Sequence, residues 1–172
     1  NAIPLLVGSS CTPTNYDSRY STVDTAYIIP NPSCGFYNGG DVWFTFTMPA
    51  SGRLRMEFSN ISPSNVSYAI YSGTCGAFTQ EEFISELDEE NTYHNTSLAG
   101  QTLFLRVWRY NNEEGQDFDV CLWEPPLVSN DYCSSASPLN VGLSCSSTSH
   151  TSIYSTSEPT SIASNPSGGA YH

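Results

Sequence analysis

Short runs of alternating apolar and polar residues, separated by turn-forming residues, limit this chain to an all-β fold. In the run DVWFTFTMP, Val42, Phe44 and Phe46 occupy alternate positions before Pro49 ends the run. Comparable runs recur along the first 124 residues, whereas helical periodicity is almost absent. The main predicted strands are 41–49, 50–59, 66–73, 101–110 and 117–123, with shorter strands at 3–8 and 25–30. Regular short strands at this spacing predict an antiparallel β-sandwich or jelly roll.

Two local connections follow from the same pattern. A Ser-Gly turn precedes 50–59, which predicts a hairpin with 41–49 whose second strand turns three charged side chains to solvent, Arg53, Arg55 and Glu57. The segment 79–91 carries six carboxylates together with apolar residues at helix-compatible spacing. A short helix and a solvated acidic loop both fit that segment.

The chain also contains an internal repeat. A shift of 134 residues aligns 1–38 with 135–172 without a gap, and 18 of the 38 positions are identical. The identical pairs include Pro4 and Pro138, Val7 and Val141, Cys11 and Cys145, and Tyr20 and Tyr154. We therefore predict a β-sandwich module at 1–124, a Pro-rich linker at 125–130, and a partial repeat of the module's N-terminal strands at 131–172.

Charge and cysteine content restrict the partners and the compartment. The chain has five arginines, no lysine and 17 acidic residues, for a formal charge of −12. This charge argues against nucleic acid and anionic lipid, both of which attract basic proteins. No apolar run reaches the roughly 20 residues that span a bilayer, so we expect no membrane insertion. An even number of cysteines, six, with few charged residues, predicts a disulfide-bonded protein that is extracellular or on the cell surface.

Several segments together carry a family resemblance. They are ND-x-C-x-x-A-x-x-L-x-V-G-x-x-C at 130–145, CGFYNGGDVWFTFTMPASGRLRMEF, YAIYSGTCGAF and AGQTLFLRVWRYNNEEGQDFDVCLW. In this order they resemble the pre-peptidase C-terminal-like β-sandwich modules, which occur in tandem in secreted and surface proteins of Bacteroidota. The resemblance covers residues 1–124 as one module and 130–172 as the front of a second. It implies a fold more than a function, because such modules accompany peptidases, adhesins and structural proteins.

The cysteines allow several pairings. Modules of this family usually carry a Cys shortly after the GTCG segment, and its absence here leaves Cys75 without the local partner that the resemblance implies. The first module contains Cys11, Cys34, Cys75 and Cys121, which allow three pairings. We expect Cys133–Cys145 as a local bridge, then Cys11–Cys34 and Cys75–Cys121, with a bridge between chains left open.

No catalytic motif accompanies the three histidines, His94, His150 and His172, and the sequence contains no GxSxG, HExxH or Gly-rich phosphate loop. We therefore predict that the chain is not an enzyme and needs no cofactor. One acidic cluster has the oxygen ligands that Ca²⁺ prefers, but it lacks the Asp/Asn alternation and the Gly of an EF-hand loop, so the sequence favours a solvated acidic loop. The cluster comprises Glu81, Glu82, Glu86, Asp88, Glu89 and Glu90. The chain has three tryptophans, Trp43, Trp108 and Trp123, which could form a sugar-stacking platform. The alternation along the strands instead favours the sandwich core for at least two of them.

Four positions match glycosylation signals. Asn60, Asn65 and Asn95 each begin an N-x-S/T sequon. Thr25 lies in Asp-Thr-Ala, which resembles the O-glycosylation signal of Bacteroidota. A Ser- and Thr-rich surface without lysine agrees with a glycosylated, protease-resistant extracellular protein.

The partial repeat suggests two functions. An isolated set of front strands buries too little apolar area to offset its ordering cost, so we expect the repeat either to be disordered or to find a partner sheet. Two explanations are open: 131–172 is a truncated second module of a longer tandem array, or it is an assembly segment. Its apolar candidates for assembly are Leu139, Val141, Ile153 and Ile162. We therefore predict a structural protein that assembles with copies of itself into a filament or surface fibre by strand complementation. The alternative is a glycan-binding or adhesin accessory module of a larger secreted protein.

Overall fold

The structure is a computed structural model that describes residues 2–22, 31–32, 37–62, 66–87, 90–110, 114–139, 141–144 and 147–155. The chain divides into a first unit, Asn1–Pro125, and a second unit, Pro126–His172. In the described part of the chain, no helix is long and apolar enough to cross a membrane. The predicted strand at 25–30 lies outside the described residues.

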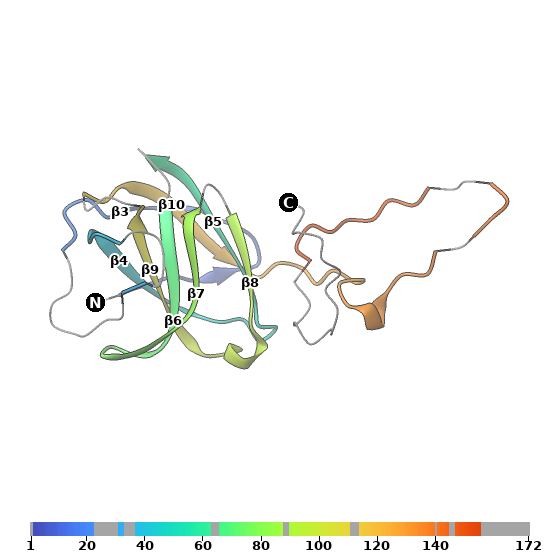
Figure 1. The fold of residues 1–172 in the computed structure, drawn as a ribbon, viewed down its shortest axis with the longest axis horizontal. Coiled ribbons are helices and arrows are strands. Elements are labelled where there is room, and N and C mark those ends of the chain that lie inside the picture. The colour runs from blue at the N-terminus through green and yellow to red at the C-terminus, as the bar shows by residue number, and fades with distance from the viewer. Residues whose placement is uncertain are drawn as a thin grey trace. The chain divides into compact units, whose positions relative to one another are not determined.

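The first unit is a β-sandwich of two sheets (Figure 1). Sheet 1 has the order β1-β4-β9-β6-β7, and its strands are Ile3–Pro4, Asp41–Thr47, Thr102–Arg109, Val66–Thr74 and Ala77–Leu87. Sheet 2 has the order β2-β10-β5-β8 with β3 also paired to β10, and its strands are Val7–Gly8, Asp117–Trp123, Arg53–Ser62, Glu90–His94 and, for β3, Thr14–Asp17. One short 3-10 turn, η1 (Thr96–Leu98), precedes β9. The predicted sandwich is confirmed.

The core lies between the two sheets. Each strand has a period of two, so alternate side chains turn inward and pack against those of the opposite sheet. Burying each large apolar side chain contributes about 1.5–3 kcal/mol. The fully or nearly fully buried members include Phe44, Phe46, Leu103, Leu105 and Val107 from sheet 1 and Leu54, Met56, Phe58, Phe118, Val120 and Leu122 from sheet 2.

The predicted hairpin between 41–49 and 50–59 is wrong. β4 pairs with β9 in sheet 1, whereas β5 pairs with β10 and β8 in sheet 2, so the connection between β4 and β5 passes from one sheet to the other. Both strands have one apolar face, and a sandwich buries these faces against each other across its interior. Alternation alone does not distinguish that arrangement from a hairpin. The link from β9 to β10 crosses between the sheets in the same way.

The acidic segment at 79–91 is neither a helix nor a loop in its described part. Most of it forms β7, the edge strand of sheet 1, which pairs with β6 so that Ala69 lies opposite Phe83, and residues 90 and 91 belong to β8. Ile84 packs against the core while Phe83 is 38% exposed. The three apolar residues have a spacing that a helix would allow, but the ladder hydrogen bonds with β6 outweigh it and hold the segment as a strand.

Two of the three charged side chains expected to face solvent on β5 are buried. Arg53 is 2% exposed and Arg55 is 9% exposed. The reason is that β5 has a neighbouring strand on both sides, so an outward side chain lies among those of β8 and β10. Arg55 donates from Nε to Glu57 Oε1 at 3.1 Å and from a terminal nitrogen to Thr92 Oγ1 at 2.9 Å, which satisfies its charge there.

The N-terminal segment forms an edge on both sheets. β1 runs parallel to β4, while β2 runs parallel to the end of β10 and β3 runs antiparallel to its beginning. Between β2 and β3, Cys11 forms a disulfide with Cys121 of β10. The expected Cys11–Cys34 and Cys75–Cys121 pairings are therefore wrong, because the pairing of β2 and β3 with β10 places Cys11 beside Cys121.

The other cysteines add little to this connectivity. Cys75 is an exposed free thiol at the turn between β6 and β7. Cys133 is exposed, whereas Cys34 and Cys145 lie outside the described residues, so the expected Cys133–Cys145 bridge stays a prediction.

The second unit contains a single short 3-10 turn, η2 (Cys133–Ser135), and no strand in its described residues (Figure 1). Three of the four assembly candidates are exposed: Leu139 at 78%, Val141 at 102% and Ile153 at 62%. The fourth, Ile162, lies outside the described residues.

Candidate binding surface

A cluster of aromatic side chains lies on the face of sheet 1 that points away from the core. We call it the outer-face cluster, and its residues are Tyr37, Trp43, Ala69, Tyr71, Phe78, Phe104 and Trp108. Ala69, Tyr71 and Trp108 are completely buried, whereas the other four are only partly buried and keep part of their surface accessible. The cluster is built from β4, β9, β6 and β7, which the sheet order places side by side.

Alternation along the strands explains why these side chains share a face. In β9 the residues Leu103, Leu105 and Val107 turn into the core, so the residues between them turn outward. The cross-strand register sets Trp43 opposite Arg106 and Arg106 opposite Ala69. The outer face of the sheet thereby gathers residues that are far apart in the sequence.

A buried ion pair anchors the cluster. Arg106 donates from Nε to Asp41 Oδ2 at 2.7 Å, and the two side chains are 3% and 2% exposed. The same carboxylate accepts hydrogen bonds from Trp43 Nε1 at 2.8 Å and from Tyr37 Oη at 2.9 Å. Asp41 is therefore the common acceptor that fixes the guanidinium of Arg106 and the rings of Trp43 and Tyr37.

The guanidinium of Arg106 also contacts two of the rings. It lies 3.9 Å from the centroid of the Tyr37 ring and 5.2 Å from that of Trp43, within the range of a cation–π interaction. Burial opposes the charge of Arg106, but the Asp41 carboxylate outweighs it and raises the pKa of the arginine. Burial, with the nearby negative charge of Asp41, raises the pKa of Tyr37 to about 12.

The rings pack against one another as a rigid group. Trp43 and Phe78 are stacked with centroids 5.3 Å apart and an interplanar angle of 13°, and Phe78 meets Phe104 edge-on at 4.9 Å. Phe78 lies opposite Gly73 on β6, and this glycine has a φ of +96° and no room for a Cβ beside the carbonyl oxygen of Ala77. Aromatic pairs of this kind each add about 0.5–1.5 kcal/mol beyond their burial.

The arrangement is suited to binding a small molecule. The two charged side chains at its centre neutralise each other, and both are buried. What is accessible is a set of apolar ring surfaces with polar groups beneath. Pockets and surfaces that recognise small polar molecules commonly combine such an apolar lining with a few fixed polar groups.

The predicted tryptophans occupy outer faces rather than the core between the sheets. Trp43 and Trp108 belong to the outer-face cluster. Trp123 is 8% exposed and donates from Nε1 to Glu57 Oε1 at 2.9 Å on sheet 2. Trp108 and Trp123 are buried, but on the outer faces of the sheets and not between them. The inward positions of β4, β9 and β10 are occupied by Phe, Leu and Val side chains, so the tryptophans point outward.

Sequence reasoning missed Tyr37, Asp41, Phe78, Phe104 and Arg106. The sequence of β9 could have indicated Arg106, because it lies between Phe104 and Trp108 on one face of the strand. The other face of β9 carries Leu103, Leu105 and Val107. A charge flanked by aromatic residues on one face of a central strand indicates a paired, buried ion. Its partner Asp41 is not recognisable without the register between β4 and β9.

The predicted calcium ligands are only partly described. Glu81 accepts a hydrogen bond from Ser72 Oγ, and Glu82 lies next to it on β7. The side chains of Glu86, Asp88, Glu89 and Glu90 lie outside the described residues. Among the described side chains, the grouping with metal-ligand spacing consists of Cys11, Glu57 and Cys121. Its two sulfur atoms are bonded to each other, which removes them as thiolate ligands.

Two of the glycosylation candidates are described. The carboxamide of Asn60, an exposed residue with φ of +49°, donates to Asp119 Oδ2. Asn95 caps η1, since its Oδ1 accepts from the Ser97 backbone nitrogen at 3.1 Å. Both amide groups are thus engaged within the protein. Asn65 and Thr25 lie outside the described residues.

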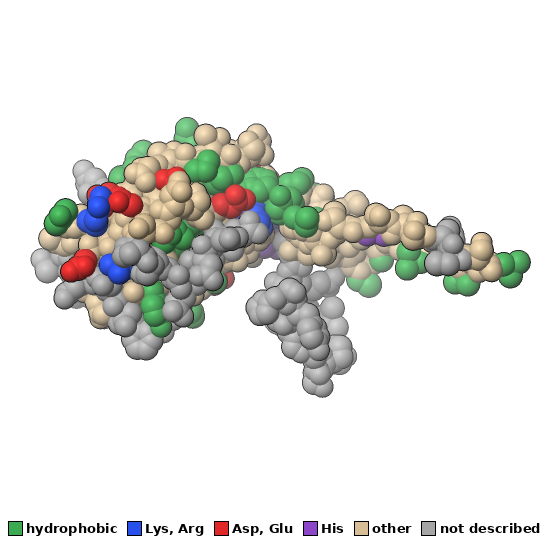
Figure 2. Space-filling model, turned by 90° about the horizontal axis from the view of Figure 1, so that it is seen from above, with side chains coloured by type: hydrophobic (Ala, Val, Ile, Leu, Met, Phe, Trp, Pro, Cys, Tyr) green, Lys and Arg blue, Asp and Glu red, His purple; other side chains and the backbone are tan. Residues whose placement is uncertain are grey.

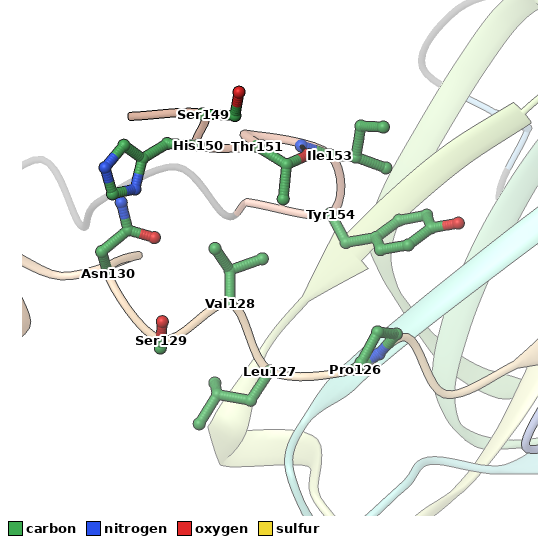
Figure 3. A pocket seen from close by; sticks show the side chains of 10 residues that line it. All are labelled: Pro126, Leu127, Val128, Ser129, Asn130, Ser149, His150, Thr151, Ile153 and Tyr154. Atoms are coloured by element: carbon green, nitrogen blue, oxygen red, sulfur yellow. Dashed lines mark hydrogen bonds between the residues drawn. The ribbon is translucent and has the colours of Figure 1, made fainter. Parts of the chain in front are cut away.

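The second unit has a cavity of its own, of about 540 Å³ (Figure 3). Segments 126–130 and 149–154 line it, and the side chains of Asn130 and His150 lie close to each other on one side. His94 lies on β8 in the first unit, and His172 is outside the described residues. The two described histidines, His94 and His150, thus belong to different units.

The surface carries few basic groups. On the face shown in Figure 2, the visible basic side chains lie beside acidic ones, and uncharged side chains dominate. Arg19 illustrates this, since it forms salt bridges with Asp17 at 2.8 Å and Asp117 at 2.9 Å. Such a surface offers no basic patch for a polyanion.

Solved structures include proteins that are similar to this chain. The pre-peptidase C-terminal domain of a Bacillus anthracis collagenase is similar with a TM-score of 0.40 and 8% identity, over 71% of this chain and 94% of that one. PliG, a periplasmic inhibitor of g-type lysozyme from Aeromonas hydrophila, is similar with a TM-score of 0.38 and 9% identity, over 71% of this chain and 99% of that one. No curated protein matches the chain in sequence.

A family model gives the assignment. The model described as galactose binding domain-like, of a T9SS-associated group, matches residues 9–120. That range includes β3 to β9, most of β10 and every residue of the outer-face cluster. The chain belongs to the T9SS-associated family of galactose-binding-domain-like modules.

Proposed function

We propose that the first unit is a non-catalytic binding module of a secreted or surface protein, and that its outer-face cluster binds a neutral glycan. The observation that carries the proposal is the set of partly exposed rings held in place by the Asp41–Arg106 pair. Membership in a T9SS-associated, galactose-binding-domain-like family supports both the export of the chain and a carbohydrate ligand.

The physical case begins with the rings. The C–H face of a pyranose is apolar, so it packs against an aromatic surface and releases water, while its hydroxyl groups remain free for polar contacts. Because the rings are already ordered by packing and by Asp41, little conformational entropy is lost when a ligand binds. This preorganisation lets weak contacts produce measurable affinity.

The charge distribution indicates which glycans fit. The guanidinium and the carboxylate of the cluster are buried and paired, so no free charge at its centre attracts an ionic ligand. The formal charge of −12 repels uronic acids and sulfated sugars at long range. A neutral oligosaccharide therefore suits this face better than an acidic one.

Assembly into a filament by strand donation is less well supported. The positions that a donated copy of the front strands would take, beside β4 and β10, are already filled by β1, β2 and β3 of the same chain. A donor would have to displace these strands and the Cys11–Cys121 bond. Glycan binding needs no such displacement, and we propose it in preference to self-assembly.

The test is calorimetric titration of the full chain with galacto-oligosaccharides, cello-oligosaccharides and polygalacturonate. We expect binding of at least one neutral probe and none of the acidic one. Phe78→Ala or Phe104→Ala should weaken that binding about two- to twelvefold, the effect of losing about 0.5–1.5 kcal/mol of stacking.

The matched control is Tyr20→Asn. Tyr20 is 95% exposed outside sheet 1, and asparagine tolerates its φ of +65°. The control should bind as the wild type does. Equal weakening by all three substitutions, or binding that prefers polygalacturonate, would refute the proposed site.

A further inference from the structure

We propose that three threonines beside the outer-face cluster determine which neutral sugar binds there. They are Thr45, Thr47 and Thr102, and we call them the threonine rim. The proposal rests on the glycan binding proposed above, because it assigns the groups that contact the hydroxyls of the same ligand. The rings then supply the apolar contact, and the rim distinguishes sugars that differ in the configuration of a single hydroxyl group.

The outer-face cluster by itself offers few polar atoms to a ligand. The carboxylate of Asp41 accepts from Trp43 Nε1 at 2.8 Å and from Tyr37 Oη at 2.9 Å, so these donors are used within the protein. The partly exposed rings therefore present mainly apolar surface. Apolar surfaces discriminate weakly between ligands that differ in a hydroxyl group, whereas hydrogen-bonding groups discriminate strongly. Recognition of a particular sugar thus requires polar groups beside the rings.

Alternation along two neighbouring strands places the threonine rim on the same face as the rings. β4 and β9 lie side by side in sheet 1 (Figure 1). On β4 the core phenylalanines alternate with Thr45 and Thr47, so both threonines turn outward. On β9 Thr102 precedes the core residue Leu103 and turns outward together with Phe104. The rim thus borders Phe104, one of the rings that keep accessible surface.

The cross-strand register sets the rim within reach of a ligand on Phe104. Thr45 lies directly opposite Phe104, and Thr47 lies directly opposite Thr102. Residues directly opposite each other have Cβ atoms about 4.5–5.5 Å apart, and diagonal neighbours such as Thr47 and Phe104 are about 7–8 Å apart. A sugar ring that stacks on Phe104 therefore extends its edge over the threonine hydroxyls.

The three hydroxyls are available to such a ligand. Thr47 and Thr102 are exposed, and Thr45 is partly buried. Within the part of the chain that the structure describes, no hydrogen bond engages the three Oγ1 atoms. A threonine hydroxyl both donates and accepts, so it complements a sugar hydroxyl, which does the same. The rim is also uncharged, in keeping with a neutral ligand.

The backbone holds the rim in place before a ligand binds. Directly beyond Thr47 and Thr102, Met48 donates its backbone N–H to the carbonyl of Gln101 at 2.9 Å, so the pairing of β4 and β9 continues past the rim. On the other side of β4, β1 pairs with the strand at Thr45. A β-branched side chain has few χ1 rotamers, so each hydroxyl on this fixed backbone has few directions. Little ordering is therefore needed when the rim binds a sugar.

The test is calorimetric titration of the full chain and of a Thr47→Val, Thr102→Val double variant. Valine keeps the branched shape and the strand preference of threonine but lacks its hydroxyl, so the fold and its urea midpoint should be kept. The probes are β-1,4-linked galacto-oligosaccharides and cello-oligosaccharides, whose units differ only in the configuration at C4. We expect the wild type to prefer one probe, and the ratio of the two dissociation constants to fall about two- to twelvefold in the variant, the effect of one net hydrogen bond.

Matched variants separate the rim from the rings and from the substitution itself. Thr14→Val, on β3 of sheet 2, should leave both affinities unchanged. Phe78→Ala should weaken binding of the tighter probe, because it removes ring surface. Equal wild-type affinities, or a double variant that keeps the ratio while Phe78→Ala still weakens binding, would overturn the role of the rim and leave the glycan-binding face standing. Should the double variant not fold, the two single variants are measured against the same outcomes. Failure of every neutral probe to bind would overturn both proposals.

Discussion

Removing the Cys11–Cys121 disulfide should destabilise the first unit by about 3–5 kcal/mol, because the bond closes a very long loop. The two cysteines are 110 residues apart, and a loop of this length gives about 4.8 kcal/mol at 25 °C in the chain-entropy model. Removal of native disulfides typically costs about 2–5 kcal/mol. The Cys11→Ala, Cys121→Ala double variant makes the change with little loss of packing volume.

The assay is equilibrium urea unfolding followed by tryptophan fluorescence. With a urea dependence of about 2 kcal/mol per molar, the midpoint of the double variant should fall by about 1.5–2.5 M. Cys75→Ala is the control, because Cys75 is an exposed free thiol, and its midpoint should match that of the wild type. A shift of the double variant below about 0.5 M would refute the view that this bond closes the sandwich.

The loss should also be localised. β2 has two residues and β3 has four, and both pair with the same edge of β10. Elements with so few ladder bonds open easily once the covalent link between them is cut. Amide hydrogen exchange of β2 and β3 should therefore accelerate far more than that of β9. Uniform acceleration across both sheets would contradict a local role.

Three further predictions concern the first unit. Asp41→Asn should lower the free energy of unfolding by about 3–5 kcal/mol, since it leaves the Arg106 charge buried and uncompensated, and a loss below about 1 kcal/mol in urea unfolding would count against the ion pair. Gly52→Ala should lower the free energy of unfolding by about 2–3 kcal/mol, because the φ of Gly52 is +69° and a Cβ there would lie 2.6 Å from the Thr96 Cα. Gly100 has a φ of +73° but open space around it, so Gly100→Ala should lower the free energy of unfolding by only about 1–2 kcal/mol. The pKa of Tyr37 is raised to about 12 from an ordinary value of 10, so the folded state holds this proton more firmly than the unfolded state. The contribution of Tyr37 to the free energy of unfolding should therefore be fully present below pH 10 and should be lost between pH 10 and 12. In Tyr37→Phe the decline in the urea midpoint over that range should be shallower, and an unchanged slope would contradict the assignment.

Alternation was sufficient to predict the class of fold and most of the strands. The run at 41–49 contains β4, the run at 117–123 coincides with β10, and both turn their apolar side chains into the core. These strands are long and strictly periodic, so local sequence determines them. Which strands become neighbours depends on contacts between residues far apart in the chain, and the predicted β4–β5 hairpin failed for that reason.

The disulfide and the candidate site show the same limit. Cys11 reaches Cys121 because β2 and β3 both lie along β10, a relation that no spacing of cysteines reveals. Asp41 and Arg106 are 65 positions apart and meet only through the β4–β9 register. The sequence identified Trp43 as a possible platform residue, but the rings that complete the cluster come from three other strands.

NMR titration of the full chain, with a neutral oligosaccharide that binds in calorimetry, tests whether the outer face of sheet 1 binds a neutral glycan. Binding at this face should change chemical shifts mainly at the outward residues of β4, β6, β7 and β9, with the indole N–H of Trp43 among the most affected. Changes confined to sheet 2 or to the second unit, with the Trp43 indole signal unmoved, would contradict it.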